Sequence, residues 1–171
     1  VIIFKIIGEK NISPIIINSV KNTLGAFLIF FTIFLLGINP FSIPEIITTK
    51  DLLILVFSGI VGLGIADILF LRSLNIVGAG ISALVDIMYS PFVIFFAFML
   101  LGEKLLYLQM IGGILIIGAI IFASYKLKNI NIEKNQLVRG IITGVMALAM
   151  MAFCIVLIKP ILNKTNLISN H

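Results

Sequence analysis

The feature that most constrains this chain is the stretch from Gly62 to Tyr125, in which long apolar segments are separated by a short polar break at residues 102–105. The only carboxylates inside these apolar segments are Asp67 and Asp86. A water-soluble domain needs polar residues at regular intervals to cover its surface, and these segments have none. The pattern therefore predicts helices that lie in lipid, and it makes the few polar side chains within them the candidates for function.

The composition supports the same environment. Hydrophobic residues make up 61% of the chain and charged residues 11%, whereas a soluble domain carries about 25% charged residues. The formal net charge of +5 fits loop Lys and Arg side chains that meet anionic lipid headgroups. No basic stripe is interleaved with aromatic residues, so we expect no nucleic-acid partner. The single cysteine, Cys154, allows no internal disulfide and is too little for a metal cluster, and we expect no metal or cofactor.

A spanning helix needs about 20 mostly apolar residues, and by that rule the chain is predicted to be an all-α integral membrane protein with about six transmembrane helices. Backbone polar groups inside lipid must be paired within a helix, which excludes open strands. The predicted spans are the start to Ile7, Val20–Ile38, Leu52–Leu71, Ile76–Leu101, Leu105–Tyr125 and Gly140–Ile158. The chain begins at Val1 inside an apolar run without the order of a secretory signal, and we expect this run to be the tail of a spanning helix.

Small residues recur at the four-residue spacing that lets helices approach closely in a membrane. The ladders are Ser58–Gly62–Ala66, Ala79–Ala83 and Gly140–Gly144. Gly and Ala are also common in spanning helices generally, and neither interpretation implies a function.

The chain contains one credible linker and a weak internal repeat. Residues 1–11 align without gaps on Ile155–Thr165, which places Lys5 on Lys159 and Lys10 on Lys164. The second copy begins soon after the most polar stretch, KLKNINIEKNQLVR. Internal duplication is typical of transporters. We therefore expect a first repeat over residues 1–128 whose first helix is truncated, a linker at 129–139, and the start of a second repeat at 140–171.

The segment Ala83–Ile121 resembles the EamA-type domain of the drug/metabolite transporter superfamily. The resemblance rests on a small-residue-rich helix with Pro91 in mid-span, then Leu101-Gly102-Glu103, then Gln109 and Gly112-Gly113. Residues 70–84, FLRSLNIVGAGISAL, are similar to the corner between the third and fourth helices of the family.

This resemblance implies a carrier of small metabolites or drugs in the plasma membrane, built in full-length members from two inverted five-helix repeats. The chain would correspond to most of the first repeat and the first helix of the second. A homodimer or a missing second repeat would complete it. Asp67 and Asp86 are not hallmark positions of the family, and we expect them to tune the substrate of this member.

Asp86 is the first candidate for substrate binding. Ser82, Asp86, Tyr89 and Ser90 share one face of the predicted helix, close to the bilayer midplane. A charge at that depth costs roughly 2.5–3.5 kcal/mol on insertion scales, so it should face a cavity or a partner. Pro91 removes the bond to the carbonyl of Ile87 and should kink the helix. The alternative is a protonated Asp86 that holds helices together through Ser82 or Ser90.

Asp67 is the second candidate. Arg72 lies five residues further on, so the two are not on one helical face and a direct pair is doubtful. Direct contact between Asp67 and Asp86 is not expected, and a relay through substrate or water is the alternative.

Glu103 and the Gly112–Gly113 pair are predicted to be structural. Glu103 would act as a clasp that caps the next helix, or it would be an ordinary solvated charge.

Other classes remain open for the chain as a whole. It could be a non-transporting fragment or assembly subunit, or a dimeric exporter like the small multidrug-resistance proteins. An intramembrane enzyme would need His, Glu or Asp clusters in interface loops, and the loops here are short and offer none.

Overall fold

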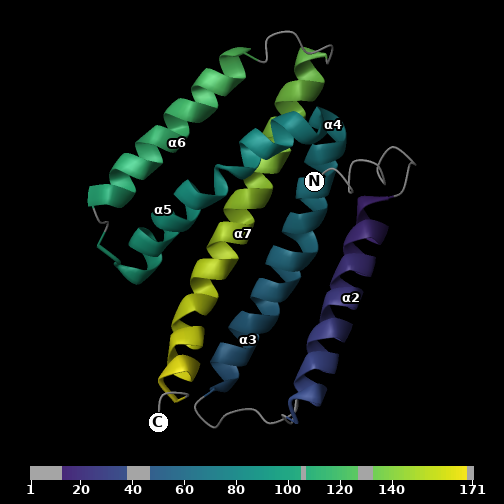
Figure 1. Ribbon diagram of the computed structural model, residues 1–171, viewed down its shortest axis with the longest axis vertical. Coiled ribbons are helices and arrows are strands. Elements are labelled where there is room, and N and C mark those ends of the chain that lie inside the picture. The colour runs from purple at the N-terminus through teal and green to yellow at the C-terminus, as the bar shows by residue number, and fades with distance from the viewer. Residues whose placement is uncertain (1–12, 38–46, 105–106, 127–132, 169–171) are drawn as a thin grey trace.

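The computed structural model describes residues 13–37, 47–104, 107–126 and 133–168, and every regular element within these ranges is a helix (Figure 1). This result confirms the predicted all-α class. The first predicted span, from the start to Ile7, lies outside the described residues.

Helix α2 (Pro14–Leu35) starts earlier than the predicted span at Val20. The hydroxyl of Ser13 accepts a hydrogen bond from the backbone N–H of Ile15, and Pro14 occupies the first turn. Ser at the N-cap followed by Pro is a strong start signal for a helix, and it outweighs the polar residues in the first two turns. The early start places Asn18 inside the helix, one turn before Asn22.

The second helical segment is a continuous column of three elements. These are α3 (Thr49–Ser58), the π-helix η1 (Gly59–Ala66) and the first half of α4 (Asp67–Asp86). The column begins with a capping box, in which Thr48 and Asp51 each bond the backbone N–H of the other.

The column ends at Gly78 and not at the predicted corner of residues 73–75. Gly78 has φ +78° and ψ +171°, a conformation that is open to glycine and strained for other residues. Ser73 is helical, and its hydroxyl donates to the carbonyl of Gly140 in α7 at 2.7 Å. A polar residue that the sequence suggested for a turn is therefore used for helix packing.

The predicted span Ile76–Leu101 is divided into two helices. The second half of α4 ends at Asp86, and α5 (Tyr89–Leu101) begins after a break at Ile87 and Met88. Pro91 lies in the first turn of α5, where its missing N–H costs least. Its ring would clash with the carbonyl of Ile87 in a continuous helix, so the break lies four residues before the proline.

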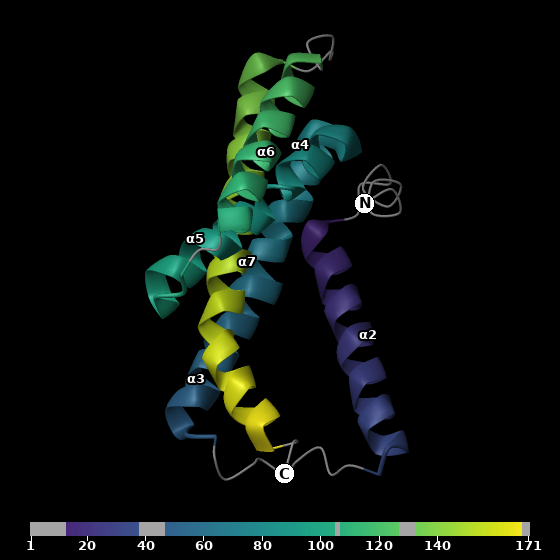
Figure 2. The same cartoon turned by 60° about the vertical axis from the view of Figure 1, so that its left-hand side comes forward.

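Two further helices complete the bundle, α6 (Tyr107–Lys126) and α7 (Lys134–Ile168). Helix α7 begins within the stretch that was predicted as a linker, and it extends beyond the predicted span Gly140–Ile158 at both ends. It is the central helix, because it packs on α3, η1, α4 and α5 (Figures 1 and 2). Helix α2 lies close to α4 at one end and diverges from α7 toward the other (Figure 2).

Glycines allow the close approach of α7 to the column. A Cβ on Gly140 would lie 2.3 Å from Cγ1 of Val77, and one on Gly144 would lie 2.6 Å from Oγ of Ser73. A Cβ on Gly62 would likewise lie 3.1 Å from Cβ of Cys154. The ladders Ser58–Gly62–Ala66 and Gly140–Gly144 are confirmed as packing surfaces. The predicted ladder Ala79–Ala83 is wrong at Ala83, which is exposed.

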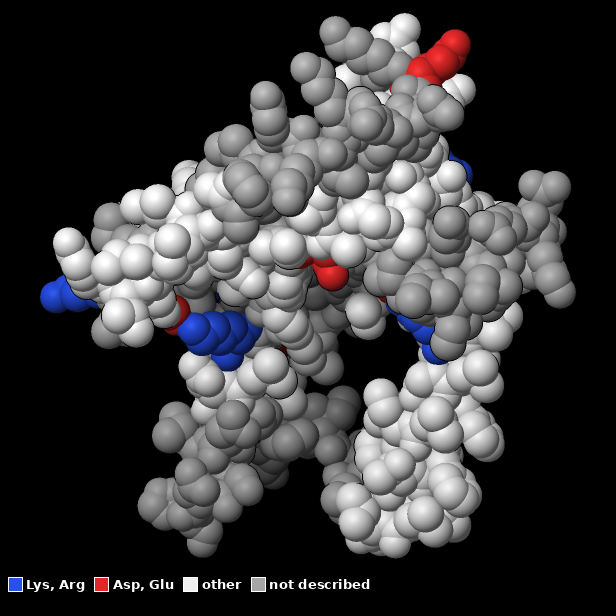
Figure 3. All heavy atoms as spheres, turned by 45° about the horizontal axis from the view of Figure 1, so that its top comes forward, with Lys and Arg blue, Asp and Glu red and all other residues white. Residues whose placement is uncertain are grey.

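The outer surface has the character of a membrane protein. Within the ranges that the structure describes, three helical segments are long and apolar enough to cross a bilayer: Pro14–Leu35, Thr49–Asp86 and Asn135–Lys164. Large apolar side chains such as Phe27, Phe34 and Leu108 are exposed. On the face in Figure 3, charged side chains occupy few places and uncharged ones cover the rest of the described surface. A surface this apolar is stable against acyl chains and not against water.

Candidate functional site

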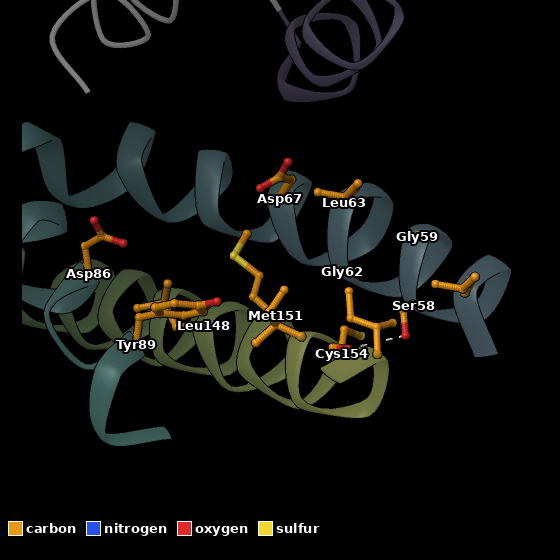
Figure 4. Close-up of a pocket in the computed structure, with 13 residues that line it drawn as sticks. Ser58, Gly59, Gly62, Leu63, Asp67, Asp86, Tyr89, Leu148, Met151 and Cys154 are labelled. Atoms are coloured by element: carbon orange, nitrogen blue, oxygen red, sulfur yellow. Dashed lines mark hydrogen bonds between the residues drawn. The ribbon is translucent and has the colours of Figure 1, made fainter. Parts of the chain in front are cut away.

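A cavity of about 450 Å³ lies between the column, the start of α5 and α7 (Figure 4). This volume is within the range of small-molecule sites in proteins. Along the column the lining residues run from Leu55 to Asp67, while the column itself runs from Thr49 to Val77. The cavity is therefore near the middle of the column.

Most of the cavity wall is apolar, and its ionisable groups are the carboxylates of Asp67 and Asp86, the phenol of Tyr89 and the thiol of Cys154. Helix α7 contributes Leu148, Met151, Cys154, Ile155 and Ile158 to the wall. In Figure 4 the side chain of Met151 rises between the two carboxylates, which come from opposite ends of α4. The structure therefore brings Asp67 and Asp86 to one cavity without direct contact, as expected from the sequence.

Asp67 forms an ion pair with Lys21 of α2. The Asp67 side chain is 15% exposed and the Lys21 side chain 40%. The pair joins two helices, and it neutralises a carboxylate that would otherwise be costly at this depth. The sequence analysis considered Arg72 and missed Lys21, because it placed Lys21 at the outer edge of its span.

The π-helix η1 is held by amide side chains of the same face of α2. The buried side chain of Asn18 donates to the carbonyls of Leu63 (2.8 Å) and Gly64 (3.2 Å), and Asn22 donates to Leu63 at 3.0 Å. A π-turn disturbs the regular α-helical bonding, and its carbonyls need partners inside lipid. The sequence reasoning missed this contact. The available signal was the i, i+3, i+4 spacing of Asn18, Lys21 and Asn22 ahead of an apolar run.

Asp86 is the last residue of α4, and it lines the cavity with an exposed side chain. Among the described residues it has neither an ion pair nor a hydrogen-bond partner. Ser82 and Ser90, the predicted alternative partners, make no contact of this kind with it. Tyr89, the first residue of α5, lies on the other side of the break at residues 87–88 and packs against the core cluster that includes Val85 and Leu148.

The two serines proposed for substrate binding lie outside the cavity lining. Ser82 is fully buried, and its hydroxyl has no hydrogen-bond partner in the described part of the chain. In a regular helix this hydroxyl could bond the carbonyl of residue 78, but Gly78 is not helical. Ser90 is exposed. The helix break separates Ser90 and Tyr89 from Ser82 and Asp86. Ser82 and Asp86 stay together on the second half of α4, where Ser82 is buried and Asp86 is exposed.

The predicted structural residues have different surroundings. Oε1 of Glu103 lies 2.5 Å from Nζ of Lys159, so Glu103 connects the end of α5 to α7. Gly112 and Gly113 lie in α6, and no described atom lies within 4 Å of a Cβ built on either of them. At the same end of the bundle, Lys164 of α7 donates to both carboxylate oxygens of Asp51, at 3.0 and 3.1 Å.

These features define the class of the protein: an integral membrane protein of apolar helices around a mid-height cavity with few charged groups. The family model of the EamA-like transporter family matches residues 1–125. The chain therefore belongs to the EamA-like transporter family, which confirms the resemblance seen in its sequence. No curated protein and no solved structure matches the chain.

Proposed function

We propose that the chain acts in a secondary carrier of small metabolites or drugs, which works by alternating access around the cavity between α4, α5 and α7. The observation that carries the proposal is the carboxylate of Asp86, which has no ion-pair partner among the described residues and lines a 450 Å³ cavity beside Tyr89. An unpaired carboxylate among apolar helices costs free energy, so its presence there points to a function. Substrate binding supplies that role.

The irregular backbone supports an exchange between two arrangements. The cavity is bordered by the π-helix η1 on one side and by the break at Ile87 and Met88 on the other. Positions at which the helical hydrogen bonding is interrupted can absorb changes in φ and ψ during a hinge motion. Transporters commonly place their binding sites at such discontinuous helices.

The proposed topology is a multi-pass protein of the plasma membrane with six spans. The described spans would be α2, the column, residues 79–101, α6 and α7. Residues 1–128 would form the first repeat, and residues 140–171 would begin the second. Residues 129–139 would connect the two repeats, and the end of this connection is already helical because α7 starts at Lys134. The family match to residues 1–125 supports the first boundary. The tight packing of α7 on the column supports a role for the helix after the connection in closing the cavity.

The test is substrate counterflow in proteoliposomes that contain the purified protein, with Asp86→Asn compared with wild type. We expect Asp86→Asn to lower the flux by about ten-fold or more, since it removes the charge that meets the substrate. Glu103→Gln is the matched control, because it changes a carboxylate outside the cavity. Unchanged flux in Asp86→Asn would remove Asp86 from the mechanism. If a folded protein shows no flux of any metabolite, the chain is an assembly subunit and not a carrier.

A further inference from the structure

We propose that the cavity selects a singly charged organic cation with an apolar body. This inference rests on the proposed carrier function and adds the substrate class to it. Three observations carry it: the net charge of the cavity wall, the chemistry of the rest of the wall, and the position of an aromatic ring beside the unpaired carboxylate.

The charge of the site is minus one when its ion pair is counted. The charged residues in the cavity wall are Asp67 and Asp86. Lys21 neutralises Asp67, whereas Asp86 has no cationic partner in the described ranges. A monovalent cation restores neutrality in a low-dielectric site, while an anion would face the charge of Asp86 without compensation.

A zwitterion such as an amino acid fits the same wall less well. Its carboxylate would need a donor, and Lys21, the cation bonded to the cavity wall, is already engaged by Asp67. The neighbouring amide groups of Asn18 and Asn22 donate to the carbonyls of η1. A buried carboxylate without donors costs far more than a methyl group in the same place. The wall therefore favours a ligand whose single polar centre is its positive charge.

The remaining wall matches an apolar body. Leu55, Leu63, Leu148, Met151, Ile155 and Ile158 supply aliphatic and thioether surface. Tyr89 lies at the Asp86 end of the cavity (Figure 4), where the face of its ring can attract an ammonium group. The cation would thus be held between a carboxylate and a ring, with its apolar part directed along α7.

Equilibrium binding to the purified protein in lipid nanodiscs tests this inference. The probe is tritiated benzyltrimethylammonium, with phenylmethanesulfonate as an anionic competitor of similar size and tetramethylammonium as a cation without an apolar body. We expect saturable binding of the probe, weaker competition by tetramethylammonium and none by the sulfonate. Asp86→Asn should weaken binding by about ten-fold or more, and Glu103→Gln should leave it unchanged.

A second pair of variants keeps the test valid if Asp86→Asn fails to fold. Tyr89→Phe should retain binding, because the ring remains, and Tyr89→Leu should weaken it by roughly three- to thirty-fold. Equal binding by Tyr89→Phe and Tyr89→Leu would overturn the inference, as would unchanged binding by a folded Asp86→Asn protein or preference for the sulfonate.

The binding assay requires no turnover, so it separates this inference from the proposed function. Binding of the probe without counterflow of the same cation would contradict the carrier and leave the cation site standing. Counterflow of anionic or neutral metabolites by a protein that does not bind the probe would contradict the cation site and leave the carrier standing.

Discussion

At the scale of single residues, the two carboxylates of the cavity have different roles because they have different neighbours. Asp67 is satisfied by Lys21 from another helix, and Asp86 has no such partner among the described residues. Of the two, only Asp86 therefore carries the free-energy cost of an unpaired charge among apolar helices. Their similar appearance in the sequence conceals this difference, which arises from a contact between residues 46 positions apart.

Lys21→Met should destabilise the protein by about 1–3 kcal/mol, because it leaves the partly buried carboxylate of Asp67 without its partner. The double variant Lys21→Met with Asp67→Asn should recover part of that loss, since it removes the unpaired charge. Thermal unfolding can be followed through a thiol-reactive dye, because Cys154 is the only cysteine and is buried. Additive losses in the double variant would show that the pair contributes nothing.

At the scale of helices, close approach and backbone breaks set the position of the cavity. Helix α7 reaches the column because Gly140 and Gly144 carry no side chain at the contact. The second half of α4 turns toward α5 because Gly78 adopts a positive φ. At Gly140 and Gly144 the reason for glycine is lack of space, and at Gly78 it is the backbone conformation. Substitution by alanine should therefore cause a steric overlap at the first two positions and backbone strain at the third.

Gly140→Ala should destabilise the protein by about 1–3 kcal/mol, because the new methyl group would overlap Val77 and Ile76. Gly112→Ala is the matched control in another helix, where no described atom lies within 4 Å of the added Cβ. The thiol-dye melting assay compares the two. Equal melting temperatures for both variants would contradict the close contact between α7 and α4.

Gly78→Ala should cost about 1–3 kcal/mol through backbone strain alone, since no atom lies within 4 Å of its Cβ but its φ is +78°. Gly80→Ala, two residues further on, has the same open space and helical dihedral angles. It should be neutral or slightly stabilising. A stable Gly78→Ala protein would mean that the helix continues through residue 78.

The helices were largely predictable from the sequence, whereas their breaks and contacts were not. Apolar runs of sufficient length define spans because lipid imposes one simple rule on the backbone. A hydropathy window does not detect that Gly78 ends a helix or that Ser73 is packed within one. The π-helix η1 was missed for another reason: the side chains that satisfy its carbonyls lie on α2, more than forty positions away.

The acidic residues of the candidate site could be predicted from the sequence, but the spatial arrangement of the polar residues around them could not. Asp67, Asp86 and Tyr89 stand out in the sequence as rare polar groups in apolar runs, and all three line the cavity. Ser82 and Ser90 were grouped with them on the assumption of a continuous helix. The break at Ile87 and Met88 invalidates that assumption for Ser90, because residues on its two sides no longer share one helical phase. Ser82 shares the second half of α4 with Asp86, but its side chain is buried in the core.

At the scale of the whole molecule, the structure combines a lipid-facing exterior with a cavity that contains ionisable groups. Large apolar side chains on α2, including Phe27, Phe31 and Phe34, are exposed where that helix diverges from the bundle. Asp86 is also exposed, yet it lines the cavity. Exposure therefore has two different meanings in the same molecule, and a solvent-accessibility measurement can separate them.

Spin labels placed at positions 31 and 86 in a Cys154→Ala background should report different solvents. We expect the label in Phe31→Cys to collide mainly with oxygen, which dissolves in acyl chains. The label in Asp86→Cys should collide mainly with a water-soluble nickel chelate. Power-saturation electron paramagnetic resonance in liposomes measures both. A label at position 86 that meets only oxygen would place this side chain in lipid and contradict the cavity.

The backbone of η1 faces two neighbours at once. The side chain of Leu63 belongs to the cavity wall, and the carbonyl of the same residue accepts hydrogen bonds from Asn18 and Asn22. We therefore expect a guest molecule that displaces the Leu63 side chain to strain the hydrogen bonds that Asn18 and Asn22 make to η1. Filling of the chamber would then be coupled to the position of α2, none of whose residues lines the cavity.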